Sequence, residues 1–197
     1  MSASAKQLVG LQRGTYGSGG EKLDWSYYDT SQIVAGLTTY RYFQTQLGAG
    51  TPAKTLDRTN LTTAGQIPQG QHFTVHAVKM FYTSYGAHGT ADVQNLYALL
   101  KITTLEIILP GKDSMGTWTL QEMFGPSIQF AMTPTAAGDN IPLHQPRYHG
   151  VFPLNTPLVL AALTPFEIRV IHHVAAPAGL ADDYLMISLT GKLLRSA

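Results

Sequence analysis

The stretch from Thr59 to Tyr82 constrains the fold more than any other part of the chain. A Gly-, Pro- and Gln-rich entry leads at His72 into the longest unbroken strand pattern in the sequence. From His72 to Ala77 every second residue is apolar, which is the period of a half-buried strand. After Ala77 the apolar positions shift phase to Val78, Met80 and Tyr82, which predicts a β-bulge or a strand covered on both sides. We expect this stretch to be an inner strand of a β-sandwich.

The rest of the chain adds seven further strand patterns and one helix. Apolar alternation or short apolar runs bounded by Gly and Pro predict strands at 37–47, 104–109, 117–123, 127–132, 158–163, 165–170 and 185–193. Gly191 is expected to form a bulge in the last strand. Apolar residues three and four apart predict a helix over 90–101, with Thr90 as its N-cap. The expected fold is an all-β, eight-stranded antiparallel jelly-roll sandwich, with one short helix between the second and third strands.

Two segments lack periodicity and are interpreted as contact elements. Residues 1–36 are rich in glycine and predict an extended N-terminal arm, leaving 37–197 as the jelly-roll domain. The arm carries Trp25, Tyr27 and Tyr28, which could dock either on their own sandwich or on a neighbour. The Pro-rich stretch 133–156 is too long for an ordinary connection and is expected to be an interface loop. Its interface candidates are His144, Arg147, Tyr148 and His149.

Composition narrows the function classes. Charged residues make up 13% of the chain and the formal net charge is +1, so a basic-patch nucleic-acid binder is not expected. A sparsely charged surface suits a protein that packs against copies of itself. It is also compatible with an ordinary sandwich that has Thr-rich faces. The chain has no cysteine, and we expect neither a signal peptide nor a membrane-spanning segment.

No catalytic or cofactor signature stands out, so we expect neither an enzyme nor a bound cofactor. On a strand, His72 and His76 lie too far apart to share a metal, and the adjacent His172 and His173 point to opposite faces. The spacing of cupin metal ligands is absent. His144 and His149 could titrate near neutral pH within an interface. The acidic turns at 139–140 and 182–183 could offer oxygen ligands to Ca²⁺, although such residues are common in turns.

The segment from Tyr40 to Phe81 resembles structural proteins of tailless icosahedral bacteriophages. The resemblance is carried by Tyr42-Phe43, the turn 48–51, Lys54-Thr55-Leu56, Thr59-Asn60-Leu61, Ala64 to Pro68, and the C-terminal residues Leu189 to Leu193 with Arg195. It implies a single jelly-roll capsid subunit that assembles into the shell of a virion. Its implied partners are identical subunits, with a second capsid protein and an internal membrane left open. The chain is too short for the double jelly roll that is common in such phages.

The leading functional expectation is therefore a self-assembling capsid protein that uses its arm and loops as contacts. Two alternatives remain. One is a lectin-like module that binds carbohydrate through Tyr-rich loops, and the other is a divergent cupin-like metalloenzyme.

Overall fold

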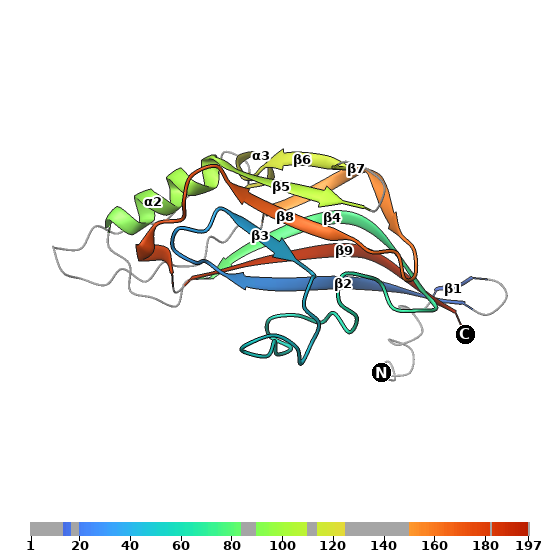
Figure 1. Cartoon of the computed structure of the whole chain (residues 1–197). Helices are drawn as coiled ribbons and strands as arrows, with labels where there is room; N and C mark the ends of the chain where they lie inside the picture. Colours follow the sequence, from blue (N-terminus) through green and yellow to red (C-terminus); the bar gives the residue numbers. More distant parts are fainter. Residues whose placement is uncertain are drawn as a thin grey trace, which may run out of the picture.

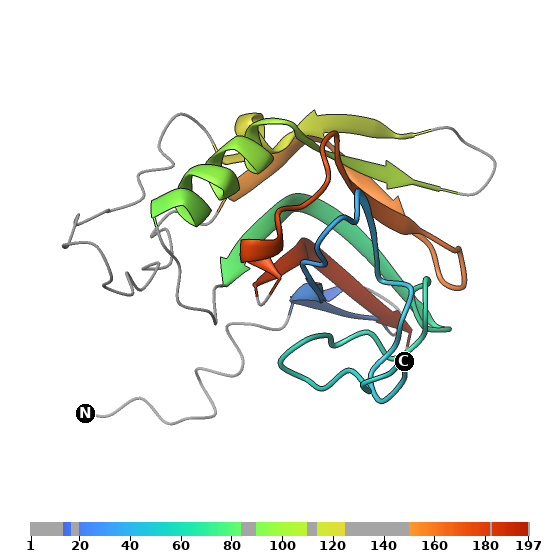
Figure 2. The ribbon, with the colours of Figure 1, turned by 60° about the vertical axis from the view of Figure 1, so that its left-hand side comes forward.

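The computed structural model describes residues 14–16, 20–83, 90–109, 114–124, 150–181 and 183–196. These residues form nine strands in two antiparallel sheets, which lie over one another as a sandwich (Figures 1 and 2). The five-stranded sheet has the order β1 (Gly14–Tyr16), β2 (Gly20–Gln32), β9 (Tyr184–Ser196), β4 (Gln71–Thr83) and β7 (Gly150–Leu160). The four-stranded sheet has the order β3 (Thr39–Tyr42), β8 (Glu167–His172), β5 (Thr103–Ile108) and β6 (Gly116–Thr119).

The chain crosses between the sheets at almost every connection from β2 to β9. Only β5 and β6 follow one another within the same sheet as paired neighbours. This path makes β2–β9 an eight-stranded antiparallel jelly roll, so the predicted fold class is confirmed. The three-residue β1 extends the first sheet beside β2.

β4 is an inner strand, as predicted, and lies between β9 and β7. Its buried residues change phase along the strand, from Phe73 and Val75 to Val78, Met80 and Tyr82. The register against both neighbours shifts between Val75 and Ala77, which confirms a bulge at the predicted place. Against β9 the extra residue is His76, which is exposed, whereas against β7 the extra residues are those of β7 between Pro153 and Leu158. In the first half of β4 the odd-numbered residues face the core, and after the bulge the even-numbered residues do so.

Gly191 lies directly opposite this bulge rather than forming one in β9. On the two sides of the bulge, Val75 of β4 pairs with Gly191 of β9 and Ala77 pairs with Thr190. A Cβ atom on Gly191 would lie 1.8 Å from the carbonyl oxygen of Thr74, a distance that no packed atom can accept. Glycine is therefore required because the bulged backbone of β4 comes too close for any side chain.

The predicted helix is present with its predicted bounds, as α2 (Thr90–Lys101). Leu96, Leu99 and Leu100 are buried and fix it against one end of the sandwich (Figure 2). α2 connects β4 to β5, which are the third and fourth strands of the jelly roll. The expected position between the second and third strands is off by one because β2 was not anticipated.

The strand predicted over 117–123 is only half right. β6 ends at Thr119, and α3 (Leu120–Phe124) follows it. The backbone N–H of Glu122 donates to the Thr119 hydroxyl at 3.2 Å, and the N–H of Thr119 donates to the Glu122 carboxylate at 3.0 Å. This reciprocal capping box starts a helix where the alternation predicted more strand. A single 3₁₀ turn, η1 (Ala178–Leu180), lies between β8 and β9.

The expectation that 1–36 forms an unpacked arm is wrong for residues 20–32. These residues are β2, and they pair with β9 along their whole length, from Gly20↔Ser196 to Gln32↔Tyr184. The predicted strand 37–47 shrinks to the four residues of β3. It ends because Phe43, fully buried, adopts a φ of 66°, a conformation that does not continue a strand.

The long loop predicted over 133–156 is wrong for residues 150–156, which belong to β7, and residues 133–149 lie outside the described residues. Of the strand expected at 158–163, only 158–160 are in a strand, as the end of β7, which lies at the edge of its sheet with Val159 exposed. The predicted strand at 127–132 lies outside the described residues. β5, β8 and β9 are confirmed, with Leu105, Ile168 and Val170 buried between the two sheets.

Candidate interaction surfaces

The aromatic residues of β2 are used mainly within this chain. Tyr27 is 3% exposed, its ring meets Phe73 edge-on at 5.1 Å, and its hydroxyl donates to Gln71. Trp25 is half-buried against the core and meets Tyr27 edge-on. Trp25 and Tyr27 therefore dock on their own sandwich, which is one of the two docking sites considered for them. Tyr27 is too deeply buried to anchor a neighbour.

Tyr28 points to the outer face of the sheet, but the loop between β3 and β4 uses its hydroxyl. That hydroxyl donates to the backbone oxygen of Leu56. The other interface candidates, His144, Arg147, Tyr148 and His149, lie outside the described residues. The interface proposed for them stays a prediction.

The same loop closes the free edge of β2. Asn60 acts as a partner for the backbone of the strand, because its side chain accepts from the N–H of Tyr28 at 3.0 Å and donates to the oxygen of Ser26 at 2.7 Å. The hydroxyl of Thr59 donates to the oxygen of Tyr28 at 3.1 Å. These bonds satisfy backbone groups that would otherwise attract a strand from another molecule.

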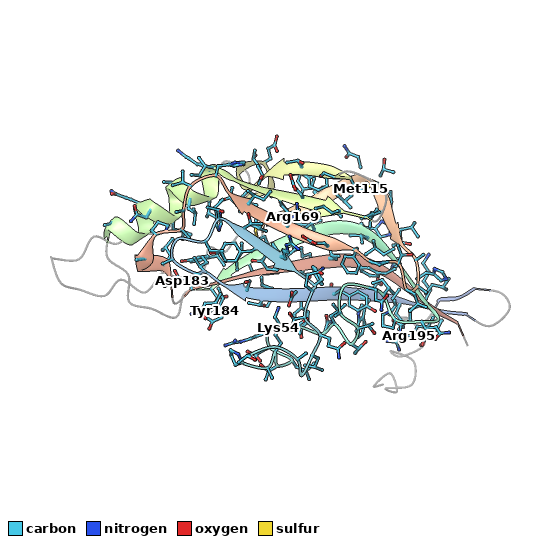
Figure 3. The ribbon with its side chains drawn as sticks, viewed as in Figure 1. Lys54, Met115, Arg169, Asp183, Tyr184 and Arg195 are labelled. Carbon is cyan, nitrogen blue, oxygen red and sulfur yellow. The ribbon has the colours of Figure 1, made fainter. Side chains whose placement is uncertain are left out.

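A buried ion pair holds this loop against β2. The ammonium of Lys54, a residue labelled on this loop in Figure 3, lies against Asp29, whose side chain is 1% exposed. The second carboxylate oxygen of Asp29 accepts from the N–H of Phe43 at 2.6 Å. Burial raises the pKa of Asp29, and the bonds from Lys54 and Phe43 partly offset that rise. The charge of Asp29 therefore depends on Lys54 being in place.

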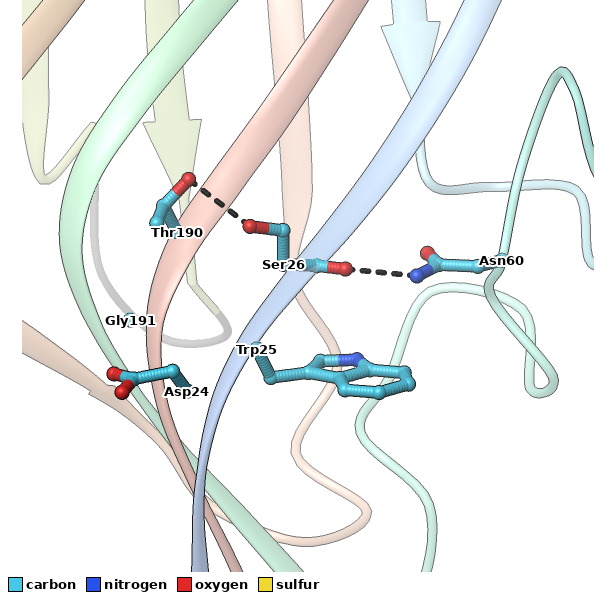
Figure 4. Close-up of a pocket in the computed structure, with 6 residues that line it drawn as sticks. All are labelled: Asp24, Trp25, Ser26, Asn60, Thr190 and Gly191. Atoms are coloured by element: carbon cyan, nitrogen blue, oxygen red, sulfur yellow. Dashed lines mark hydrogen bonds between the residues drawn. The ribbon is translucent and has the colours of Figure 1, made fainter. Parts of the chain in front are cut away.

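Two cavities on the five-stranded sheet are the candidate small-molecule sites. The first, of about 390 Å³, is lined by Asp24, Trp25, Ser26, Asn60, Thr190 and Gly191 (Figure 4). Trp25 and Asp24 are consecutive on β2 and point to opposite sides of the strand. The Ser26 hydroxyl already donates to Thr190, and Asp24 pairs with Lys192. These groups do not converge on one point, so the cavity does not form an aromatic platform with polar groups around it.

The second cavity, of about 450 Å³, lies between the tip of the loop and the outer face of the sheet. Its lining residues are Thr30, Gln32, Asp57, Arg58, Thr83, Tyr184 and Met186. The Arg58 guanidinium lies 5.0 Å from the centre of the Tyr184 ring and donates to its hydroxyl at 3.3 Å. Arg58 thereby fastens the loop tip onto β9 and forms part of the cavity wall.

Comparison with protein families, curated proteins and solved structures finds no match. Within the described ranges, no three His, Cys, Asp or Glu side chains gather where a metal ion could be held. The described helices include none with the length and hydropathy of a membrane span.

The histidines lie as the strand geometry predicts. His72 and His76 are both exposed on β4. His172 and His173 point to opposite faces, with His172 only 2% exposed and His173 at the surface. Glu167 and Arg169 form an ion pair at 3.0 Å on the outer face of the four-stranded sheet, and Arg41 approaches the same carboxylate at 3.6 Å.

His172 links α2 to the sheet. The Thr103 hydroxyl donates to the backbone oxygen of Leu99 at 2.6 Å, so it accepts a hydrogen bond from Nδ1–H of His172, also at 2.6 Å. Nε2 of His172 is buried and has no hydrogen-bond partner. Burial, with a smaller contribution from the neighbouring His173, lowers the pKa of His172 to about 4. The ring is therefore neutral at physiological pH.

We expect acid to destabilise the protein through His172. The pKa is about 4 in the folded state and 6.5 ordinarily, so the unfolded state takes up the proton first as the pH falls. The destabilisation caused by His172 is absent above pH 6.5 and grows as the pH falls. Near pH 4 it lowers the free energy of unfolding by about 3 kcal/mol. His172→Asn keeps an N–H donor for Thr103 but does not titrate. Urea unfolding near neutral pH and near pH 4 should therefore show wild type losing more stability than the variant. Equal losses would contradict the assignment.

The described sheet edges carry features that hinder pairing with another strand. β3 and β6, at the edges of the smaller sheet, have four residues each. At one edge of the larger sheet, β1 has three residues and covers only the start of β2, and Thr59 and Asn60 close β2 further along. β7 carries Pro153 and Pro157, which have no N–H to donate. Contacts between copies would therefore have to use faces and loops.

Proposed function

We propose that this protein is a structural subunit of a viral capsid that assembles with copies of itself into the shell of a virion. The observation that carries the proposal is the strand order, β2-β9-β4-β7 facing β3-β8-β5-β6, around an interior filled by apolar side chains. Jelly rolls of this kind recur in capsid proteins, lectins and cupins. Strand order alone does not choose among the three, because one fold serves many functions.

The interior and the cavities favour a structural role over a binding or catalytic one. A cupin keeps a metal site between its sheets, whereas here that space is filled by apolar side chains such as Phe73, Leu105 and Ile168. A lectin needs polar groups that converge on a sugar. The groups lining the first cavity point to two sides of β2, and the Arg58 side chain in the wall of the second is already engaged with Tyr184.

The surface supports self-assembly. Closed sheet edges prevent uncontrolled strand addition between copies, which is a hazard for a protein present at high local concentration. Only 13% of residues are charged, so much of the surface is neutral. A neighbouring copy can cover such a surface without removing many charged groups from water. A shell then gains stability from many repeated interfaces of ordinary size.

The test is the assembly state of the purified chain. Light scattering and negative-stain images should show regular particles that grow with protein concentration. A protein that stays a monomer at every concentration would overturn the proposal, unless a second capsid protein restores assembly. Retention on a glycan array would support the lectin alternative, and stoichiometric metal by elemental analysis would support the cupin alternative.

A further inference from the structure

The outer face of the four-stranded sheet carries two rows of side chains that run across its strands (Figure 1). Residues that pair across antiparallel strands send their side chains to the same face. One row, which we call the charged row, consists of Arg41, Arg169, Glu106 and Thr117 on β3, β8, β5 and β6. The next, the neutral row, consists of Thr39, Ile171, Thr104 and Thr119. None of these side chains is buried, so the face is open to a partner.

Charge changes sign along the charged row. From β3 to β6 the row presents a cation, a second cation, an anion and a neutral hydroxyl. Arg41 and Arg169, the latter labelled in Figure 3, approach the same carboxylate oxygen of Glu167 through Nε, at 3.6 Å and 3.0 Å. Within the described residues, the terminal NH₂ groups of both guanidinium groups make no hydrogen bond. Two cations thus share one carboxylate, and each has donors left for another.

Glu106 supplies the opposite need. Its cross-strand neighbour Arg169 is engaged by Glu167, and no cation of the described part of the chain lies within ion-pair distance of the Glu106 carboxylate. A half-buried carboxylate gains from a cation that a partner brings, because exclusion of water strengthens the attraction between them. One half of the charged row therefore has spare donors, and the other half has a spare acceptor.

We infer that this face packs against the same face of a second copy, about a two-fold axis that runs parallel to the strands between β8 and β5. The inference rests on the proposed function, because it names one contact by which subunits of a shell would join. The axis places β8 over β5 of the other copy, so Arg169 meets the partner's Glu106 and Glu106 meets the partner's Arg169. Each contact occurs twice, as in any isologous interface. The order of charges along the row is what identifies a second copy as the occupant.

The rest of the face fits the same arrangement. The axis places Ile171 over the partner's Thr104, so short β-branched side chains meet between the sheets. Packed sheets lie about 10 Å apart, a gap that an arginine and a glutamate side chain can bridge together. A two-fold axis that crossed the strands along the charged row would instead set Arg169 against its own copy. Repulsion between like charges disfavours that alternative.

The pair is expected to be weak on its own. Strands of four to six residues give a smaller contact than a standard interface of roughly 800 Å² per partner. An isologous contact also stops at a dimer, so a shell needs further contacts through other surfaces. The quantity to measure is therefore the protein concentration at which particles first appear.

Charge reversal on either side of the axis tests the pairing. Glu106→Arg sets two cations against each other at both contacts of the pair, and Arg169→Glu sets two anions there. Each variant should raise the concentration at which light scattering detects particles by about tenfold or more. An equimolar mixture of the two variants should assemble like wild type, because every arginine faces a glutamate in the mixed pair. The double variant, which carries both reversals in one chain, should assemble for the same reason.

The control is Lys192→Glu, which reverses a charge on the outer face of the other sheet and should leave the onset of assembly unchanged. Thermal melting followed by circular dichroism checks that each variant folds. If Arg169→Glu fails to fold because Glu167 loses its partner, Glu106→Arg and the double variant still decide the question. Assembly of Glu106→Arg at the wild-type concentration, or a folded double variant that does not recover assembly, would overturn the inference and leave the proposed function standing. A wild-type protein that stays monomeric at every concentration would overturn both.

Discussion

Replacing Gly191 by alanine should lower the free energy of unfolding by about 4 kcal/mol, at the upper end of what single substitutions cost. The added Cβ would lie 1.8 Å from the Thr74 oxygen and 3.0 Å from the Val75 Cα. Both are backbone atoms of β4, which is held between two strands and cannot move aside as a side chain would. Chemical denaturation followed by circular dichroism measures the effect, and the variant could fail to accumulate as folded protein.

Gly48→Ala is the control for this prediction. Gly48 has a φ of 79°, but a Cβ there would meet nothing within 4 Å. Its substitution tests backbone conformation without a clash and should cost about 1 kcal/mol. If the two variants lose the same stability, close approach of β4 is not the reason for glycine at 191.

Replacing Lys54 by methionine should cost about 3 kcal/mol near neutral pH. The substitution keeps most of the side-chain volume but leaves the Asp29 carboxylate buried without its cation. The pKa of Asp29 is already raised by burial and should rise further in the variant. A raised pKa means that the folded state binds the proton first as the pH falls. The loss of stability should therefore shrink in acid, as measured by unfolding at several pH values.

Two further variants isolate the ion pair. Asp29→Asn in the Lys54→Met background removes the buried charge while keeping an oxygen for the N–H of Phe43, so the double variant should be more stable than Lys54→Met alone. Lys192→Met removes the partner of Asp24, whose side chain is 83% exposed, and should change stability little. A Lys54→Met variant as stable as wild type would show that Asp29 finds water or another donor.

The elements that sequence predicts best are those in which local pattern and tertiary role agree. In β4 the phase change at Ala77 is visible because each half of the strand sends its own alternating residues into the core. In α2 the apolar stripe, the N-cap and the final lysine all indicate the same bounds. Gly191 could be singled out in β9, although the backbone that requires it belongs to β4, more than a hundred residues earlier.

β2 was missed because its inward residues do not look like a strand interior. Trp25 and Tyr27 face inward, but the next inward residue is Asp29. A carboxylate breaks an apolar alternation, and only Lys54 and the N–H of Phe43, both brought in by a later loop, make its burial tolerable. No window of local sequence contains these partners. The capping box at Thr119 and Glu122, by contrast, was available in the sequence and was outweighed by the strand pattern around Trp118.

The candidate surfaces show the same limit. Aromatic content marked Trp25 and Tyr27 as contact residues, but which side of a strand a residue occupies depends on the sheet that the strand joins. The apolar run before Pro165 predicted a strand correctly. Its place at a sheet edge, which exposes Val159, follows only from the order of strands in space.

The pairing of β2 with β9 also constrains how the protein can be made. Ser26 bonds Thr190, a partner 164 positions further along the chain, so the middle of the larger sheet joins the first long strand to the last. On a ribosome β2 emerges early and has no neighbour to complete it until β9 has been synthesised. Contacts of such long range fold slowly and expose unsatisfied strands in the meantime. The edge of β2 that faces β9 therefore stays unpaired in the nascent chain until β9 has been synthesised.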